Sequence, residues 1–265
     1  MFKKFIQIWH KVTKRQKFIV GVAFLSLVLF ISEHLFSKSS IYIVFFISFL
    51  TDLFLFWAVR EDLKENFFPQ VLILPFSYSL SFSLFYFLVP GRFLTRILMT
   101  SLYAFGLYSL FLSQNIFIVS SIRTIALLAS ARTVSLIITL LSYFFIMNVI
   151  FSLHLNAFFT LFLIFTASFP LILQSIWTYS LNKRLLADIA WVAVLTLCLT
   201  EIASILWFWP VIPTIIGLFL AGFFYITVGL SHVWLDKRLF KSVMWEYIWV
   251  AVIVFSVFTF FSFKS

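Results

Sequence analysis

The chain alternates between long apolar runs and short polar connections. Each run has about 20 residues, which is the length that a helix needs to cross a bilayer. We therefore predict an all-α fold, a polytopic transmembrane helical bundle with about nine spans and short interfacial amphipathic helices. The predicted spans are residues 18–35, 41–59, 69–89, 93–112, 134–153, 157–179, 188–208, 211–231 and 246–263. Short connections make successive helices antiparallel neighbours.

Residues 113–133 interrupt this pattern between the fourth and fifth spans, because they are too polar for a span and too apolar for a free loop. In a helix over 116–131, Ile118 and Ile122 share one face while Arg123 takes the other. That helix would be about 24 Å long, shorter than the hydrocarbon core of about 30 Å. We predict an amphipathic segment that lies in the interface or re-enters the membrane, and both alternatives stay open.

The whole chain, residues 1–265, is predicted to be a single integral membrane domain. Residues 1–17 would form a basic interfacial helix and residues 18–112 the first four spans. Residues 113–133 would be the interfacial or re-entrant segment, and residues 134–265 would hold the last five spans. A further surface helix is predicted over 232–245, with its basic side chains on one side.

Composition places this fold in lipid. Hydrophobic residues make up 63% of the chain, only 11% are charged, and the mean hydropathy is +1.13. The net charge of +10 comes from basic residues that border the spans, and they form no groove with stacking aromatics, so we predict no nucleic-acid partner. A cytoplasmic N-terminus would put most of the 19 Lys and Arg residues inside, next to anionic lipid headgroups, the predicted partner.

Polar side chains at membrane depth are the candidate site residues, because burying a charge there is costly. From their depths we predict two clusters. The first pairs Asp52 with Arg123, and the second pairs Glu201 with Arg96, possible further members being Asn148 and His154. Such clusters can fix helix register, relay a proton or ion, or bind a charged headgroup.

Enzyme signatures are not found in the sequence. It has no Gly-rich phosphate loop, no HExxH and no GxSxG motif, and its only cysteine is Cys198. We predict no catalytic residues, no cofactor and no metal site, and the sequence favours a protein that is not an enzyme. His232 and Asp236 have i, i+4 spacing, but two residues are weak grounds for a metal. With six Gly and no GxxxG run, a tight glycine crossing is not expected either.

The run from Phe87 through Asn148 contains VPGRF, LTR and YSLFLSQNIFIVSSIRTIALLASARTV. In this run the chain resembles an uncharacterised family of polytopic membrane proteins from bacteria of the candidate phyla radiation. The resemblance implies a multi-pass protein of the bacterial cytoplasmic (inner) membrane. It carries no catalytic or binding residues.

Three functions are left open by the sequence. The first is binding or moving a small molecule or lipid, and the second is a non-catalytic membrane scaffold or subunit of a larger complex. A lipid-modifying enzyme is the third. A polar cavity open to one side would favour transport, whereas a filled core with lateral apolar grooves would favour a scaffold.

Overall fold

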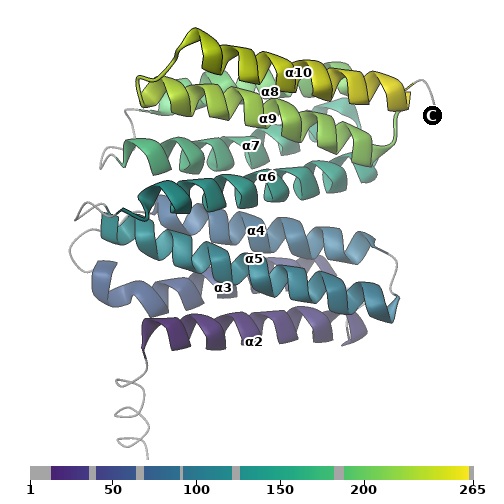
Figure 1. The fold of residues 1–265 in the computed structure, drawn as a ribbon. Coiled ribbons are helices and arrows are strands. Elements are labelled where there is room, and N and C mark those ends of the chain that lie inside the picture. Colours follow the sequence, from purple (N-terminus) through teal and green to yellow (C-terminus); the bar gives the residue numbers. More distant parts are fainter. Residues whose placement is uncertain are drawn as a thin grey trace, which may run out of the picture.

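The computed structural model describes residues 13–35, 40–63, 69–89, 92–120, 126–181 and 188–262. These residues form nine helices, and all nine are long and apolar enough to cross a membrane (Figure 1). They are α2 (Lys14–Leu35), α3 (Ser40–Leu63), α4 (Gln70–Leu88), α5 (Phe93–Ser120), α6 (Leu128–Ser152), α7 (Ala157–Ser180), α8 (Ile189–Trp207), α9 (Pro213–Leu235) and α10 (Lys241–Ser262). The predicted all-α class and the nine spans are confirmed.

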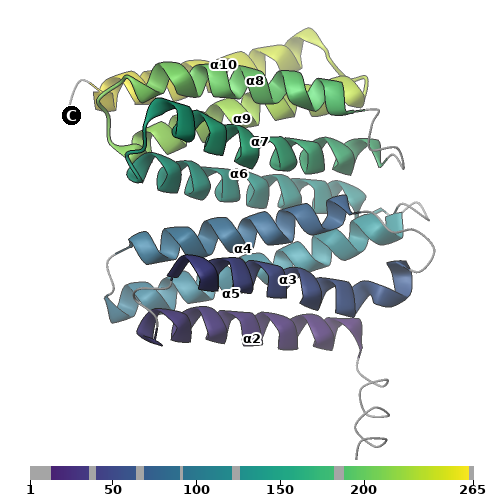
Figure 2. The same ribbon diagram turned by 180° about the vertical axis from the view of Figure 1, so that it is seen from behind.

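The helices are arranged as two stacked four-helix units, α2–α5 and α6–α9 (Figures 1 and 2). Both units have the same packing order: the first helix packs on the second and fourth, and the third helix also packs on both. The second and fourth helices of each unit are in contact too. Helix α10 packs on α9, as α6 packs on α5. The bundle is therefore one four-helix arrangement used twice in the same orientation, followed by an added helix.

The two units meet along a seam made by α4 and α5 of the first unit and α6 and α7 of the second. Helix α4 packs on both α6 and α7, and α5 packs on α6. We call the end of the bundle at which α2 begins the first end, and the opposite end the second end. Helices α4 and α6 start at the first end, whereas α5 and α7 finish there.

The separate helix predicted for residues 116–131 is wrong. Helix α5 continues past the predicted span end to Ser120, and α6 begins already at Leu128. Residues 113–120 and 128–133 therefore belong to two long helices, and Ala126 and Leu127 form a turn. Arg123 lies outside the described residues, so the interfacial position of this connection stays a prediction.

The surface helix predicted for residues 232–245 is also wrong. Helix α9 ends at Leu235, and α10 begins at Lys241. The amide N–H of Lys237 donates to Trp234 O and that of Arg238 to Val233 O, both at 3.0 Å. This pair of bonds closes the end of α9 and turns the chain. The basic helix predicted for residues 1–17 lies mostly outside the described residues, and α2 begins at Lys14.

A chain of hydroxyl groups holds the first unit together in its interior. Thr51 Oγ1 of α3 donates to Ser79 Oγ of α4 at 3.1 Å, and Ser79 Oγ lies 2.8 Å from the hydroxyl of Tyr103 on α5. All three side chains are fully buried. The Tyr103 ring stacks on Tyr78 with 5.7 Å between centroids. Hydrogen bonds between helices are satisfied here without any charged group, as suits a lipid environment.

Two glycines allow α9 and α10 to approach closely, contrary to the expectation from the sequence. A Cβ atom at Gly222 would lie 2.7 Å from Val254 Cγ2, and one at Gly229 would lie 2.6 Å from Tyr247 Cε1. Each glycine therefore forms a hole for a side chain of α10. The two glycines are seven residues apart, so a search for GxxxG spacing does not find them.

The outer surface of the bundle is apolar. Tyr42, Phe105 and Phe158 are 72–82% exposed, and exposed Leu, Ile and Phe side chains cover most of the helices. A water-soluble protein rarely exposes so much contiguous apolar surface. We conclude that this surface contacts lipid and that the chain is a multi-pass membrane protein.

Candidate functional site

The largest pocket described lies at the seam, on the side where α3 and α7 face the viewer in Figure 2. It has a volume of about 890 Å³ and is bordered by α3, α4, α6 and α7. Residues from Pro69 to Leu88 line it along the length of α4. Ile41 and Phe45 on its rim are 62% and 52% exposed. The pocket is therefore long, apolar and open sideways, toward the lipid.

Asp52 is the one charged side chain among the residues that line this pocket. It lies near the middle of α3 and is partly buried. Its Oδ1 atom is buried and accepts no hydrogen bond from the described residues. The other polar lining groups are the hydroxyls of Ser77, Ser142 and Thr166. The partner predicted for Asp52, Arg123, lies outside the described residues, so that pairing stays a prediction.

The predicted pair of Glu201 and Arg96 is not formed. Arg96 is on α5, which packs on α2, α3, α4 and α6. Glu201 is on α8, which packs on α7 and α9, and its side chain is exposed. The two residues have compatible depths but belong to different units of the bundle, so the second predicted cluster must be corrected.

Asn148 joins two helices of the second unit instead. Its Nδ2 donates to Thr214 Oγ1 of α9 at 3.0 Å, and its Oδ1 accepts a long bond of 3.4 Å from Ser152. The side chain is 6% exposed. The backbone of Gly217 passes close by, because a Cβ atom there would lie 3.3 Å from Asn148 N. Asn148 therefore fixes the contact between α6 and α9.

His154 follows the end of α6 and closes that helix. Its backbone is left-handed, with φ 46°, and its N–H donates to Phe151 O at 3.3 Å. The side chain is exposed and lines a smaller pocket of about 280 Å³ with Trp207 and Trp209. The last two members of the predicted cluster are thus structural, one between helices and one in a turn.

Replacing His154 with glycine is expected to stabilise the protein, because glycine adopts a left-handed backbone without the steric cost that other residues meet. The greater freedom of glycine in the unfolded chain offsets part of the relieved strain, so the net gain in the free energy of unfolding should be about 0.5–1 kcal/mol. Unfolding in mixed micelles of sodium dodecyl sulfate would measure it. A His154→Ala variant, which keeps the strain, should show no such gain.

The serine side chains of α4 serve two purposes. Ser79 bonds to α3 and α5, as described above, and Ser81 Oγ donates to Tyr78 O of its own helix at 3.1 Å. Ser77 lines the large pocket. Serines on one face of α4 therefore take part in helix packing, and Ser77 on another face lines a cavity.

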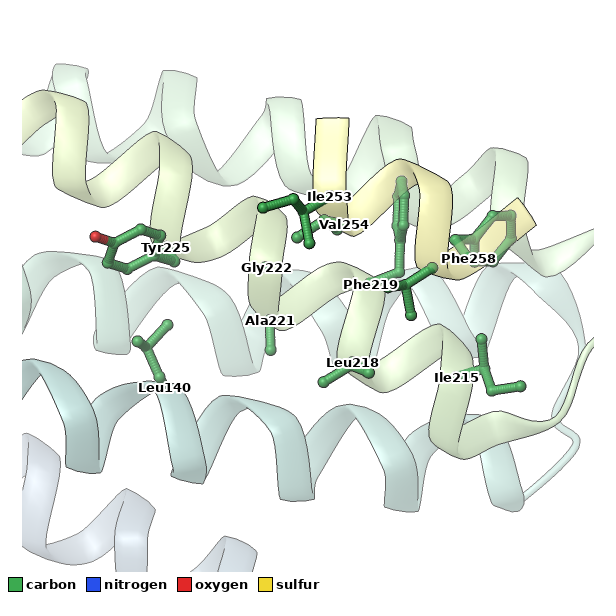
Figure 3. Close-up of a pocket in the computed structure, with 11 residues that line it drawn as sticks. Leu140, Ile215, Leu218, Phe219, Ala221, Gly222, Tyr225, Ile253, Val254 and Phe258 are labelled. Carbon is green, nitrogen blue, oxygen red and sulfur yellow. The ribbon is translucent and has the colours of Figure 1, made fainter. Parts of the chain in front are cut away.

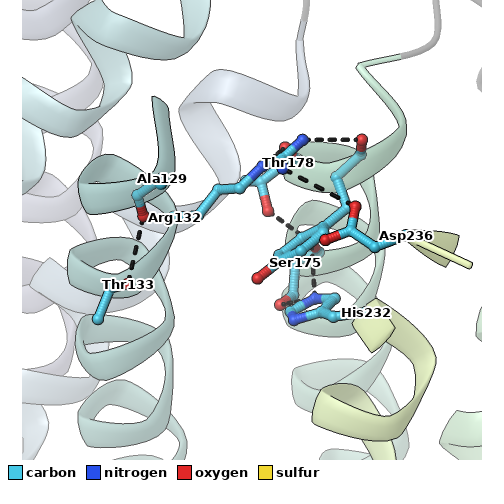
Figure 4. A network of polar contacts seen from close by, with 8 residues as sticks. Ala129, Arg132, Thr133, Ser175, Thr178, His232 and Asp236 are labelled. Atoms are coloured by element: carbon cyan, nitrogen blue, oxygen red, sulfur yellow. Dashed lines mark hydrogen bonds and ion pairs between the residues drawn. The ribbon is translucent and has the colours of Figure 1, made fainter. Parts of the chain in front are cut away.

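A polar network at the first end joins α6, α7 and α9 (Figure 4). Arg132 of α6 donates from Nε to Thr178 O and from Nη2 to Tyr179 O, both at 3.1 Å. These carbonyls belong to the last turn of α7, which has no helical partners for them. The guanidinium also lies 4.3 Å from the centre of the Tyr179 ring. Arg132 thereby caps α7 and fastens it to α6.

His232 of α9 and Asp236, the residue that follows this helix, complete the network. His232 is 4% exposed, and its Nε2 lies 3.1 Å from both Ser175 Oγ and Ser175 O. Its ring stacks on Tyr179 with 3.8 Å between centroids. Asp236 Oδ1 is 4.0 Å from Arg132 Nη1. Among the described residues no group of three His, Cys, Asp or Glu side chains could hold a metal.

The sequence alone treated Arg132 only as one of many positive charges. Its special role could have been suspected from its place near the start of a long apolar helix, where a lone cation must find partners. The partner it finds, however, is the backbone of another helix, which no side-chain pattern reveals.

Comparison with known proteins supports the expectation of an uncharacterised membrane family. No curated protein and no solved structure matches the chain. A family described as "Protein of unknown function (DUF5656)" matches residues 19–261, and this range includes all but the first residues of α2 and the last of α10. Because the match covers most of the sequence, the chain belongs to the DUF5656 family.

Proposed function

We propose that this protein binds an amphiphilic lipid in the seam pocket, with the apolar chain along α4 and the polar group at Asp52. The observation that carries the proposal is the contrast within the pocket, where a long apolar lining surrounds one carboxylate whose buried Oδ1 is unbonded. A carboxylate at this depth costs free energy unless something donates to it. A lipid with a hydroxyl or amino group would supply that donor.

The shape of the pocket suits such a ligand. The lining along α4 from Pro69 to Leu88 corresponds to about 28 Å of helix, close to the thickness of the hydrocarbon core. The volume of about 890 Å³ falls in the upper part of the range of small-molecule sites. Because the rim is open sideways, a lipid could enter from the bilayer without crossing water.

Replacing Asp52 with leucine is expected to reduce lipid retention about tenfold or more, because a hydrogen bond to a charged group contributes roughly 1.5–3 kcal/mol. The measurement is native mass spectrometry of the protein released from nanodiscs, with bound lipid counted and identified. Asp52→Asn should keep part of the binding, since its amide oxygen still accepts a hydrogen bond.

Glu201→Leu is the matched control, because it removes an exposed acidic side chain far from the pocket. A second variant, Leu84→Trp, fills the pocket without touching Asp52, and Leu197→Trp adds the same bulk to an exposed face of α8. Equal lipid retention by the Asp52 and Glu201 variants, and by the two tryptophan variants, would refute the proposal.

We also propose that the protein lies in the bacterial inner membrane with its first end in the cytoplasm. Arg15, Arg60, Arg132 and Lys237 lie at the first end, so the positive-inside rule puts that end in the cytoplasm. Single cysteines at Lys237 and at Arg92, in a Cys198→Ser background, would test this in intact cells with an impermeant maleimide. We expect labelling only at position 92, and labelling at 237 would reverse the orientation.

A second candidate function, a scaffold, is favoured by the pocket between α6, α9 and α10 (Figure 3). It has a volume of about 370 Å³ and an almost entirely apolar lining, and Phe258 is the only buried side chain of α10. A photo-crosslinker at Ile253, on the lining, would give a discrete protein adduct if a partner helix occupies this pocket. The same group at Leu197 is the control, and lipid adducts from both sites would argue against a scaffold.

A further inference from the structure

A second group of buried polar side chains lies inside the seam, and none of its members lines the Asp52 pocket. Each of the four seam helices contributes one: Gln70 from α4, Gln114 from α5, Ser135 from α6 and Gln174 from α7. All four are at least 97% buried. We call these four residues the glutamine layer.

The four residues lie at similar depth, near the first end. Helix α6 ends and α7 begins at the second end, and Ser135 and Gln174 are the same number of residues away from those two helix ends. The two side chains also meet, because Gln174 Nε2 lies 3.5 Å from Ser135 Oγ. Gln114 and Ser135 are each about two turns from the ends of α5 and α6 that face each other. Gln70 is the first residue of α4, which is shorter than α5 and so begins deeper in the bundle than α5 ends. Gln70 therefore lies within about one turn of the depth of Gln114.

An aromatic contact brings α5 and α7 together beside this layer. The rings of Phe117 and Trp177 meet edge to face, with 6.3 Å between their centroids. Gln114 precedes Phe117 by one helical turn, and Gln174 precedes Trp177 by one turn, in two helices that run in the same direction. The two glutamines therefore lie at similar depth, one helical turn nearer the middle of the bundle than the aromatic contact.

Most of the hydrogen-bonding capacity of the layer is unused. Both amide atoms of Gln114 are buried without a partner among the described residues, and so are the Oε1 atoms of Gln70 and Gln174. An amide buried in this way costs free energy, and in known proteins such groups are bonded to protein or to an internal molecule. The layer thus offers several acceptors and at least one donor around one level of the seam.

The chemistry of these groups indicates an uncharged ligand. The layer contains no carboxylate, which a divalent cation would require. Arg132 precedes Ser135 by one helical turn, and its positive charge disfavours a further cation nearby. The amide donor and the amide acceptors are matched only by a molecule that both accepts and donates hydrogen bonds.

We propose that the glutamine layer is a binding site for small uncharged molecules with hydrogen-bond donors and acceptors, either solvent water or a dissolved polyol. The site is independent of the proposed lipid pocket. Failure of lipid binding at Asp52 would leave it unaffected, since the two sites share no residue.

Radiolytic hydroxyl labelling of the protein in nanodiscs tests this, because it modifies buried side chains that touch bound water. Phe117 and Phe82 are both 0% exposed and form a matched pair, because Phe117 lies one turn from Gln114 whereas Phe82 packs among the rings of Tyr103 and Phe145. We expect Phe117 to be modified at least fivefold faster than Phe82. Gln114→Leu, or Gln174→Met if the first variant does not fold, should bring the two rates close together.

A second arm with glycerol distinguishes the two sources. If water is the ligand, glycerol shifts the melting temperature of the wild type and of Gln114→Leu equally. If a polyol is the ligand, glycerol stabilises the wild type more than the variant and slows modification of Phe117. The proposal is overturned if Phe117 reacts no faster than Phe82 and glycerol does not distinguish the wild type from the variant.

Discussion

Replacing Arg132 with alanine is expected to destabilise the protein by roughly 3–5 kcal/mol. The guanidinium makes two charge-assisted hydrogen bonds to the last carbonyls of α7, and each contributes roughly 1.5–3 kcal/mol. Without it, Thr178 O and Tyr179 O lose their partner at a helix end, where the helix itself supplies none. The stacking on Tyr179 is lost as well. The ion pair with Asp236 adds little, because it is long and partly exposed.

The free energy of unfolding in mixed micelles measures this loss. Arg132→Lys should fall between alanine and the wild type, because an ammonium group cannot span two carbonyls as the planar guanidinium does. Arg238→Ala is the control, since that side chain is exposed in the turn after α9 and its removal should cost less than about 0.5 kcal/mol. An Arg132→Ala variant as stable as the control would show that the cap contributes nothing.

The positions of the helices could be predicted from the sequence because lipid imposes a simple rule. Every backbone polar group must be bonded within its own segment, so long apolar runs become helices. Boundaries such as Ala157 for α7 and Leu35 for α2 agree with the pattern. Hydropathy therefore predicts depth along the membrane normal well.

Which helices pack side by side could not be predicted in the same way, because hydropathy does not specify the neighbours of a helix. Glu201 and Arg96 were paired by depth, yet α8 and α5 lie in different units of the bundle. Asn148 has its real partner, Thr214, at the same depth on α9. A single sequence offers several polar groups at each level, and only the packing order decides which of them meet.

The central stretch was misread for a related reason. The predicted helix began at Ile116 and left Ser113 and Gln114 outside it, but these two side chains belong to the long helix α5 and are buried, at 3% and 0% exposure. In lipid, an amphipathic helix can turn its polar face toward other helices, which inverts the rule for soluble proteins. The same inversion explains why Gln70, Gln114 and Gln174 were overlooked, since the predicted clusters were built around charged side chains and Asn148 was the one amide included.

Substituting alanine for Gly106 is the other change with a large expected effect. A Cβ atom at this position of α5 would overlap the hydroxyl of Tyr78 on α4 and lie 2.8 Å from its Cζ. Tyr78 cannot move aside, because it is fully buried and its ring lies between Tyr103 and Phe82, at 5.7 and 5.6 Å between centroids. Overpacking a core costs about 1–3 kcal/mol, and we expect a loss near the top of this range.

Gly21→Ala supplies the control for this prediction, since its Cβ would lie 3.2 Å from Phe54 Cδ1, on a side chain at the partly exposed edge of the unit. There the better helix propensity of alanine should offset the contact and leave stability within about 1 kcal/mol. Combining Gly106→Ala with Tyr78→Leu removes the clashing ring, so the two changes should cost less together than the sum of their separate costs. Additive costs, or equal effects at Gly106 and Gly21, would mean that the glycine is not required for the contact between α4 and α5.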